Sequence, residues 1–163
     1  MEIPAELRSD YGDQPFQCCT RCGEGVEDMP EGYQISKLVR DRETIYEYAL
    51  CHDCHTGLLA KFSAESRRRI ELFHNEHVSL NMRELHCAVC GRERSQHAEY
   101  ALTAACIHDR VIHQLMVCGP CRREMDSLLS PETRQVWDQF INENLPGVPA
   151  TVPAPSPLEL LPV

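Results

Sequence analysis

The sequence contains no apolar run approaching the ~20 residues that a membrane-spanning helix needs. Its first fourteen residues are polar and acidic, so we expect no secretory signal peptide. Basic residues are also scarce: 16 Lys and Arg stand against 25 Asp and Glu, a formal net charge of −9 at pH 7. Binding to phosphate backbones draws on a basic excess, so this composition disfavours a nucleic acid partner. We therefore expect a cytoplasmic protein in a reducing environment, without membrane association.

Cysteine, by contrast, is abundant, with ten residues in a chain of 163. Eight of them form four Cys-x-x-Cys pairs: Cys19/Cys22, Cys51/Cys54, Cys87/Cys90 and Cys118/Cys121. Two such pairs separated by 28 or 27 residues are typical of a tetrahedral metal site, most often structural zinc. Disulfides are the alternative in a secreted protein. The paired spacing and the polar N-terminus favour metal.

The four pairs belong to an internal repeat. Cys19, Cys22 and Gly23 match Cys87, Cys90 and Gly91 at an offset of 68 residues. From the second pairs onward the offset is 67, and it continues along the chain. The further matches are Ser63 with Ser130, Glu65 with Glu132, Phe73 with Phe140, Asn75 with Asn142 and Glu76 with Glu143. Such agreement, in register with all eight paired cysteines, indicates two copies of one unit.

The repeat divides the chain into four segments. We expect a flexible acidic arm over residues 1–15, zinc units over residues 16–81 and 82–145, and a proline-rich disordered tail over residues 146–163. Units of about 60 residues have marginal hydrophobic cores. A bound metal adds the missing stability, because its binding free energy becomes folding free energy.

Each unit is expected to contain a β-hairpin followed by helices. Period-two alternation and turn residues predict strands over 33–39 and 44–50 in the first unit, and over 99–107 and 110–117 in the second. In both units the second cysteine pair opens an apolar helical pattern. Ser63 and Ser130 then read as N-caps of a further helix, and Pro131 occupies its first position in the second unit.

A knuckle, a β-hairpin and a helix with the second cysteine pair in its first turn resemble the treble-clef zinc fingers. The resemblance covers about 45 residues of each unit and implies a small, metal-stabilised α+β fold of two tandem units. It implies two Zn²⁺ per chain, one held by Cys19, Cys22, Cys51 and Cys54, the other by Cys87, Cys90, Cys118 and Cys121. The group ranges from DNA-binding and protein-interaction fingers to ribosomal proteins and HNH-type nucleases, so it leaves the function open.

Rubredoxin also uses Cys-x-x-Cys-Gly pairs, around a single iron. The first pair of each unit fits that pattern, but the second does not. Cys54 and Cys121 are followed by His55 and Arg122 and then by a helix, where rubredoxin has glycine and a loop. This difference favours zinc.

A few residues leave alternatives open for the ligand sets. Cys18 could replace Cys19, although the repeat register favours Cys19. A site of three cysteines and His55 is conceivable, but the second unit has Arg122 there and an intact set of four cysteines. Cys106 lies on a predicted strand and is expected in the core.

The remaining polar clusters fit a solvated surface. His74 and His77 stand three residues apart on a helix, as metal ligands can, but the second unit has Ile141 and Asn144 there, so we expect surface residues. The run from Arg67 to Arg69 is expected on a solvated helix face, with an anion or partner site as the alternative.

The sequence provides no catalytic set, so we expect no enzyme activity. His113 is the one candidate for a nuclease-like histidine, and no acidic residue or asparagine is placed to complete an HNH-type set. Sites of four cysteines leave no coordination position for water. We expect a protein-interaction, scaffold or regulatory module with a protein partner; an HNH-like nuclease relative is the remote alternative.

The other alternative is a nucleic-acid-binding zinc finger. Its local basic patches would be formed by Arg67–Arg69, Arg92, Arg94, Arg122 and Arg123.

The composition of the last helix indicates that one of its faces is covered. It is apolar at Val136, Trp137 and Ile141, so it must cover the other unit, a second chain in a homo-oligomer, or a partner.

Overall fold

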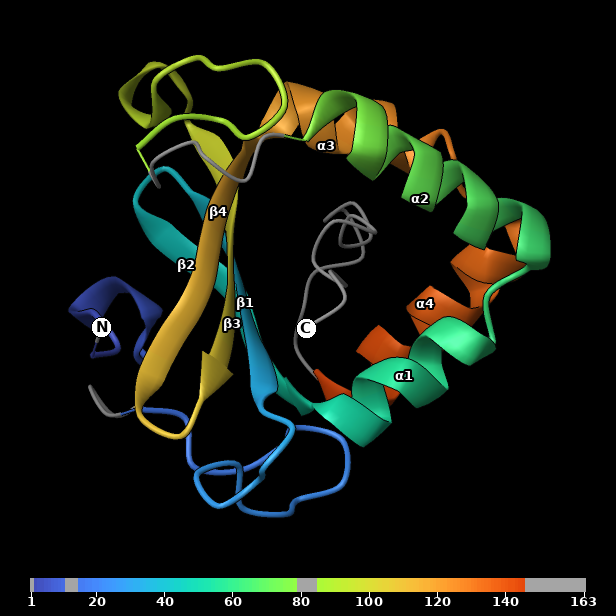
Figure 1. Ribbon diagram of the computed structural model, residues 1–163. Helices are drawn as coiled ribbons and strands as arrows, with labels where there is room; N and C mark the ends of the chain where they lie inside the picture. The colour runs from blue at the N-terminus through green and yellow to red at the C-terminus, as the bar shows by residue number, and fades with distance from the viewer. Residues whose placement is uncertain (1, 11–14, 79–84, 146–163) are drawn as a thin grey trace.

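The computed structural model describes residues 2–10, 15–78 and 85–145. Within these ranges the chain forms one four-stranded antiparallel sheet with four α-helices on one side (Figure 1). The expected α+β class is confirmed. None of the helices in the described ranges has both the length and the apolar character that crossing a membrane requires. The elements are β1 (Tyr33–Arg40), β2 (Glu43–Cys51), α1 (His52–Ala60), α2 (Ala64–His77), β3 (Glu99–Ile107), β4 (Arg110–Cys118), α3 (Gly119–Asp126) and α4 (Pro131–Asn144), with short 3₁₀ turns at Ala5–Leu7 and Arg94–Gln96.

The two predicted hairpins, β1–β2 and β3–β4, are joined edge to edge. The strand order is β2-β1-β3-β4, so β1 and β3 lie at the centre. They pair antiparallel from Tyr33 opposite Cys106 to Arg40 opposite Glu99. Ser36 pairs with Thr103, which follows it by 67 residues, so the hairpins are related by a local two-fold axis through this pair. The two units therefore share one sheet and one hydrophobic core; the expected boundary at residues 81 and 82 lies outside the described residues.

The last helix of the second half, α4, packs on the first half. Trp137 and Phe140 of α4 pack edge-on against Tyr48 of β2, at ring-centroid distances of 6.4 and 5.6 Å. Trp137 also meets Phe62, just after α1, at 6.2 Å. The apolar side of the last helix thus covers the first unit. Packing on the other unit was one of the three alternatives expected from its sequence.

The crossover is fixed where α2 and α4 begin. Each helix has the predicted serine N-cap: Ser63 accepts from the amide of Ser66, and Ser130 from that of Thr133. The two caps also bind each other, since the Ser63 and Ser130 hydroxyls lie 2.9 Å apart. The Ser63 amide donates to Thr133 Oγ1, and the Ser130 amide donates to Ser66 Oγ, both at 2.9 Å. These reciprocal bonds satisfy helix-end donors that otherwise lack partners.

The N-terminal segment covers the sheet face opposite the helices (Figure 1). Ile3 and Leu7 are buried in the core. The buried Lys37 ammonium group lies 3.2 Å from the Asp10 carboxylate and 3.3 Å from that of Glu47. We expected a flexible arm here, but residues 2–10 are packed and ion-paired. The tail expected to be disordered, residues 146–163, lies outside the described residues.

Gly32, at the entry to β1, gives a direct test of the join between the hairpins. Its φ is +80°, and an added Cβ would lie 2.4 Å from the carbonyl oxygen of Cys106 on β3. Gly32→Ala should therefore destabilise the protein by roughly 2–4 kcal/mol, through backbone strain and a clash that a strand cannot easily relieve. Gly25→Ala is the matched control, because its Cβ would meet only a carbonyl oxygen at 3.9 Å. Equal denaturation midpoints for the two variants would contradict this packing.

Candidate metal centres

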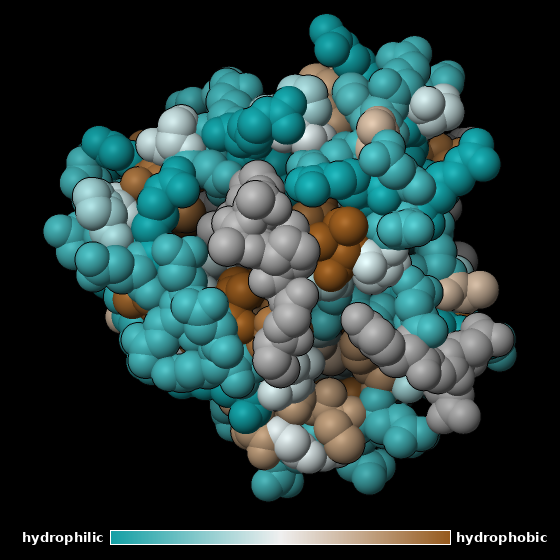
Figure 2. Space-filling view, turned by 180° about the vertical axis from the view of Figure 1, so that it is seen from behind, coloured by the Kyte–Doolittle hydropathy of each residue, from teal (hydrophilic) through white to brown (hydrophobic). Residues whose placement is uncertain are grey.

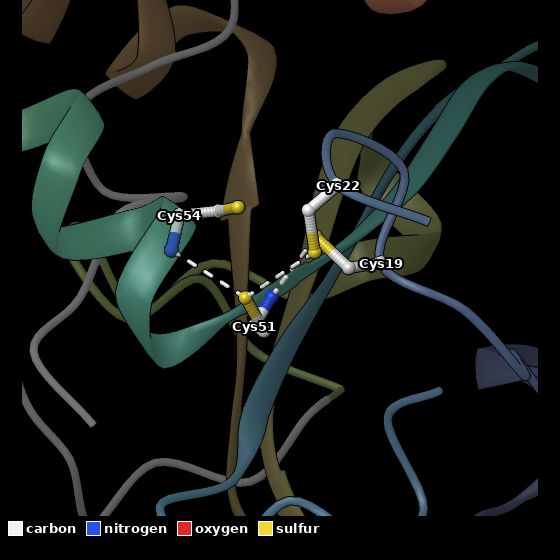
Figure 3. Close-up of side chains that lie close together, drawn as sticks. All are labelled: Cys19, Cys22, Cys51 and Cys54. Atoms are coloured by element: carbon white, nitrogen blue, oxygen red, sulfur yellow. Dashed lines mark hydrogen bonds between the residues drawn. The ribbon is translucent and has the colours of Figure 1, made fainter. Parts of the chain in front are cut away.

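The first centre lies at one end of the sheet. Cys19 and Cys22 come from the loop before β1, Cys51 ends β2, and Cys54 lies in the first turn of α1. Their sulfur atoms all lie within 4.8 Å of one another, and Figure 3 shows the four side chains converging. The sulfurs of Cys22 and Cys51 are 3.9 Å apart.

The second centre repeats this arrangement at the opposite end, because β2 and β4 run in opposite directions. Cys87 and Cys90 precede β3, Cys118 ends β4, and Cys121 lies in the first turn of α3. The four sulfurs again lie within 4.8 Å of one another. The sulfurs of Cys90 and Cys118 are 3.8 Å apart.

These spacings fit a tetrahedral zinc ion. With Zn–S bonds of about 2.3 Å, a regular tetrahedron places its sulfurs about 3.8 Å apart. The structure thus brings the eight predicted cysteines together as two tetrads that can each hold a metal ion. Within the described ranges, neither tetrad includes Cys18 or His55, the two open alternatives.

Each knuckle is shaped by a glycine and tied to a sheet edge. Gly23 and Gly91 both have φ of +76°, a left-handed conformation that side chains disfavour. Their amides donate to the carbonyls of Cys19 and Cys87, both at 2.9 Å. The Thr20 amide donates to Ala49 of β2 at 2.7 Å, and the Ala88 amide donates to Met116 of β4 at 2.8 Å. The knuckles therefore occupy the outer edges of the sheet where the metal centres lie.

Backbone amides support the buried sulfurs. The amide of Cys51 donates to the sulfur of Cys19, and that of Cys118 to the sulfur of Cys87, both at 3.4 Å. Burial raises the pKa of both acceptor thiols, but these and neighbouring amide donors outweigh it, so the pKa of Cys19 and of Cys87 falls below its usual value. Both sulfurs are thus prepared for the thiolate form that metals bind.

The later cysteines need a cation to ionise. Burial first, and then the neighbouring sulfurs, raise the pKa of Cys54 and of Cys121 well above the usual range, and that of Cys118 to about 11. Four thiolates cannot coexist this closely without opposing charge, and a bound divalent cation would provide it. With four protein sulfurs as ligands, a tetrahedral ion has no position left for water or substrate, which is the pattern of a structural site.

Other predicted residues lie away from the tetrads. Cys106 is fully buried, as expected for a core residue, and burial raises its pKa to about 12. Cys18 and His113 are exposed. His77 is exposed as expected, whereas His74 is half-buried, and burial lowers its pKa to about 4.

The sequence analysis missed a buried charged cluster at the end of β1. Arg122 is only 1% exposed and donates to Glu99 at 3.2 Å and to the Tyr46 hydroxyl at 3.3 Å. Arg40 binds the same Glu99 carboxylate at 2.8 Å. Burial also raises the pKa of the nearby Asp126 to about 6, against the opposing effect of Arg122. The one signal for this burial was the position of Arg122, directly after a predicted ligand.

Metal content tests the two tetrads. Purified protein should contain two zinc ions per chain by elemental analysis and should be colourless, because zinc has no d–d absorption. Cys106→Ser, which alters a buried cysteine outside both tetrads, should retain two ions. One ion per chain, or the absorbance of an iron–thiolate centre, would contradict the assignment.

Disrupting one tetrad tests whether the two halves of the chain form one cooperative folding unit. Cys121→Ser should reduce amide-hydrogen protection in β1 and β2 as well as in β3 and β4, because the central pairing makes one sheet. Cys18→Ser, an exposed cysteine outside the tetrads, is the control and should change neither hairpin. Loss of protection confined to β3, β4 and α3 would show two independent units instead.

Comparison with family models, with curated proteins and with solved structures finds no match to this chain. The functional assignment therefore rests on the geometry of the two tetrads and of the fold that carries them.

Proposed function

We propose that this chain is a protein-interaction module, of scaffold or regulatory type, whose fold is held by two structural zinc ions. The observation that carries the proposal is the closed nature of both centres. Each offers four cysteine sulfurs within 4.8 Å of one another, enough to fill a tetrahedral shell. A metal held in this way stabilises a surface and performs no chemistry of its own.

We further infer that the halves are treble-clef-like units derived from an internal duplication. The same order of knuckle, hairpin, short helix and long helix occurs twice. Residues 67 positions apart meet at the local axis, both in the sheet at Ser36 and Thr103 and at the helix caps Ser63 and Ser130. A duplicated unit that first paired with its own copy would produce this arrangement.

The absence of enzyme activity remains part of the proposal. His113, the catalytic candidate from the sequence, is an exposed residue of the edge strand β4. All ten cysteines are unpaired, which supports a reducing compartment such as the cytoplasm.

Several arginines of the nucleic-acid alternative are already engaged. Arg122 is buried against Glu99, Arg94 lies 3.0 Å from Glu6, and Arg69 lies 2.5 Å from Glu65. The exposed remainder is Arg67, Arg68, Arg92 and Arg123. With a net charge of −9, these four arginines give little attraction to a phosphate backbone. This favours a protein partner.

The apolar surface is small and dispersed. Viewed from behind, the molecule is largely hydrophilic, with hydrophobic side chains gathered in limited areas (Figure 2). The large exposed hydrophobic residues in the described ranges are Leu72, Leu85 and Ile112, each about half exposed. Small apolar areas among polar ones suit a reversible contact better than a permanent oligomer interface.

Comparing the wild-type protein with one double variant distinguishes protein binding from nucleic-acid binding. The full-length protein and the variant Arg67→Glu/Arg68→Glu should capture the same proteins from native extracts, with or without nuclease treatment. Neither should bind labelled duplex or single-stranded oligonucleotides at physiological salt. Oligonucleotide binding that weakens steeply with salt and disappears in the double variant would establish the nucleic-acid function instead.

A further inference from the structure

A pocket outside the two tetrads lies where three separate segments of the chain meet. The N-terminal segment, the loop before β1 and the turn between β3 and β4 line it, and its volume is about 480 Å³. Pockets that bind small molecules have volumes of about 300–1,000 Å³. This pocket is therefore large enough for a small ligand.

Contacts between the three segments hold the pocket in shape. The Tyr33 hydroxyl donates to the carbonyl of His108 at 2.8 Å, and His108 Nδ1–H donates to the carbonyl of Glu27 at 2.7 Å. Glu2 pairs with Arg110, the first residue of β4, in an antiparallel bridge. Because these contacts are made within the protein, little ordering remains to be done when a ligand binds.

One part of the pocket is apolar and partly aromatic. Ile3 and Tyr33 are buried, Phe16 is half-buried, and Pro15 is exposed. The Phe16 side chain packs on the hydrophobic core, which fixes its position. Aromatic and aliphatic walls of this kind bind the apolar part of a ligand.

The rest of the pocket carries charges of both signs. Arg8 forms no ion pair with another described residue, and its Nε atom is buried without an acceptor there. The carboxylates of Glu27 and Asp109 are exposed and likewise form no ion pair or hydrogen bond within the described ranges. Groups of both signs thus remain available to a ligand.

The two carboxylates act on the same part of the pocket. Burial first, and then the charges of Cys106, Glu27 and Asp109, raise the pKa of Tyr33 well above its usual value. Charges affect the ionisation of a hydroxyl in this way only when they lie near it. The negative part of the pocket therefore lies around Tyr33.

This balance of charges restricts the class of ligand. Together with Glu2, the lining has three carboxylates and one guanidinium group. That excess of negative charge repels a phosphate dianion, and a simple cation would leave Arg8 without a partner. A ligand with a carboxylate and an ammonium group matches both signs, because each charge can form a charge-assisted hydrogen bond.

We propose that this pocket binds a small zwitterion of the amino-acid class that has an apolar side chain. The ligand carboxylate binds the guanidinium group of Arg8, and its ammonium group faces Glu27 and Asp109. The apolar side chain contacts Phe16. This inference does not rest on the proposed function, because none of the cysteines of the tetrads lines the pocket.

The ligand class can be tested on the wild-type, full-length protein with three related probes. L-phenylalanine carries both charges, N-acetyl-L-phenylalanine only the carboxylate, and L-phenylalaninamide only the ammonium group. In a titration followed by backbone amide chemical shifts, L-phenylalanine should bind with a millimolar dissociation constant or lower, with shifts centred on Phe16, Glu27 and Asp109. Each derivative should bind at least roughly tenfold more weakly, because it lacks one charge-assisted hydrogen bond.

A dipeptide identifies the source of the zwitterion. Glycyl-L-phenylalanine carries the same two charges at a greater separation. Stronger binding than that of L-phenylalanine would support short peptides as ligands, and weaker binding would support free amino acids. Either result agrees with the proposal when both compounds shift the amides of the pocket.

Variants of opposite charge effect test the roles of the residues. Arg8→Gln should weaken L-phenylalanine binding at least roughly tenfold and leave L-phenylalaninamide binding as strong or stronger. Glu27→Gln/Asp109→Asn should give the reverse pattern, with weaker L-phenylalanine binding and no loss for the N-acetyl derivative. Arg68→Gln, which removes an exposed arginine of α2, is the control and should change none of these affinities.

Several results would overturn the proposal. One is the absence of amide shifts at the pocket with every probe at millimolar concentration, a result that needs no variant. Equal binding of L-phenylalanine and its N-acetyl derivative would indicate an anion site, and equal binding of L-phenylalaninamide would indicate a cation site. Equal affinities of Arg8→Gln and Arg68→Gln for L-phenylalanine would also contradict it.

Discussion

The antiparallel pairing of β1 with β3 is the interaction on which the rest of the structure depends. It joins the two hairpins into one sheet, and it leaves the candidate metal centres at opposite ends of that sheet. Once the strands pair, each long helix begins beside the local axis at Ser63 or Ser130, and α4 crosses onto the other hairpin. The core is therefore built from both halves.

The two tetrads lie at opposite ends of this sheet and connect the sheet to the loops and helices beside it. Each links a knuckle on an outer edge to the end of a strand and the start of a helix, so a bound ion would fix three local structures. Amide donors prepare Cys19 and Cys87 as thiolates, while burial and crowding oppose ionisation of the later cysteines. A metal ion bound at either tetrad would have to overcome that opposition, and its net binding free energy would add to the folding free energy. Structural zinc contributes on this scale in small domains whose cores are marginal.

The local features could be predicted from the sequence because their causes are local. Cysteine spacing identified both tetrads, alternation identified all four strands, and Ser63 and Ser130 identified the helix starts. The β1–β3 pairing could not be predicted, because period-two alternation marks a strand but not its neighbour. The burial of Lys37 and Arg122 was also missed, since their partners Glu47, Asp10 and Glu99 are brought near by the fold. Ile3 and Leu7 are two aliphatic residues in a short segment with no strand or long helix pattern, a signal too weak to indicate packing.

Stepwise removal of zinc is the most direct test of the claim that both centres hold one cooperative body. Native mass spectrometry during a chelator titration counts the chains that carry two, one or no ions, and the charge-state distribution reports whether each is folded. The shared sheet predicts that the one-ion species stays scarce and that the second ion leaves as the chain unfolds. Accumulation of a compact one-ion species as the main intermediate would contradict that claim and would restore two independently stabilised units.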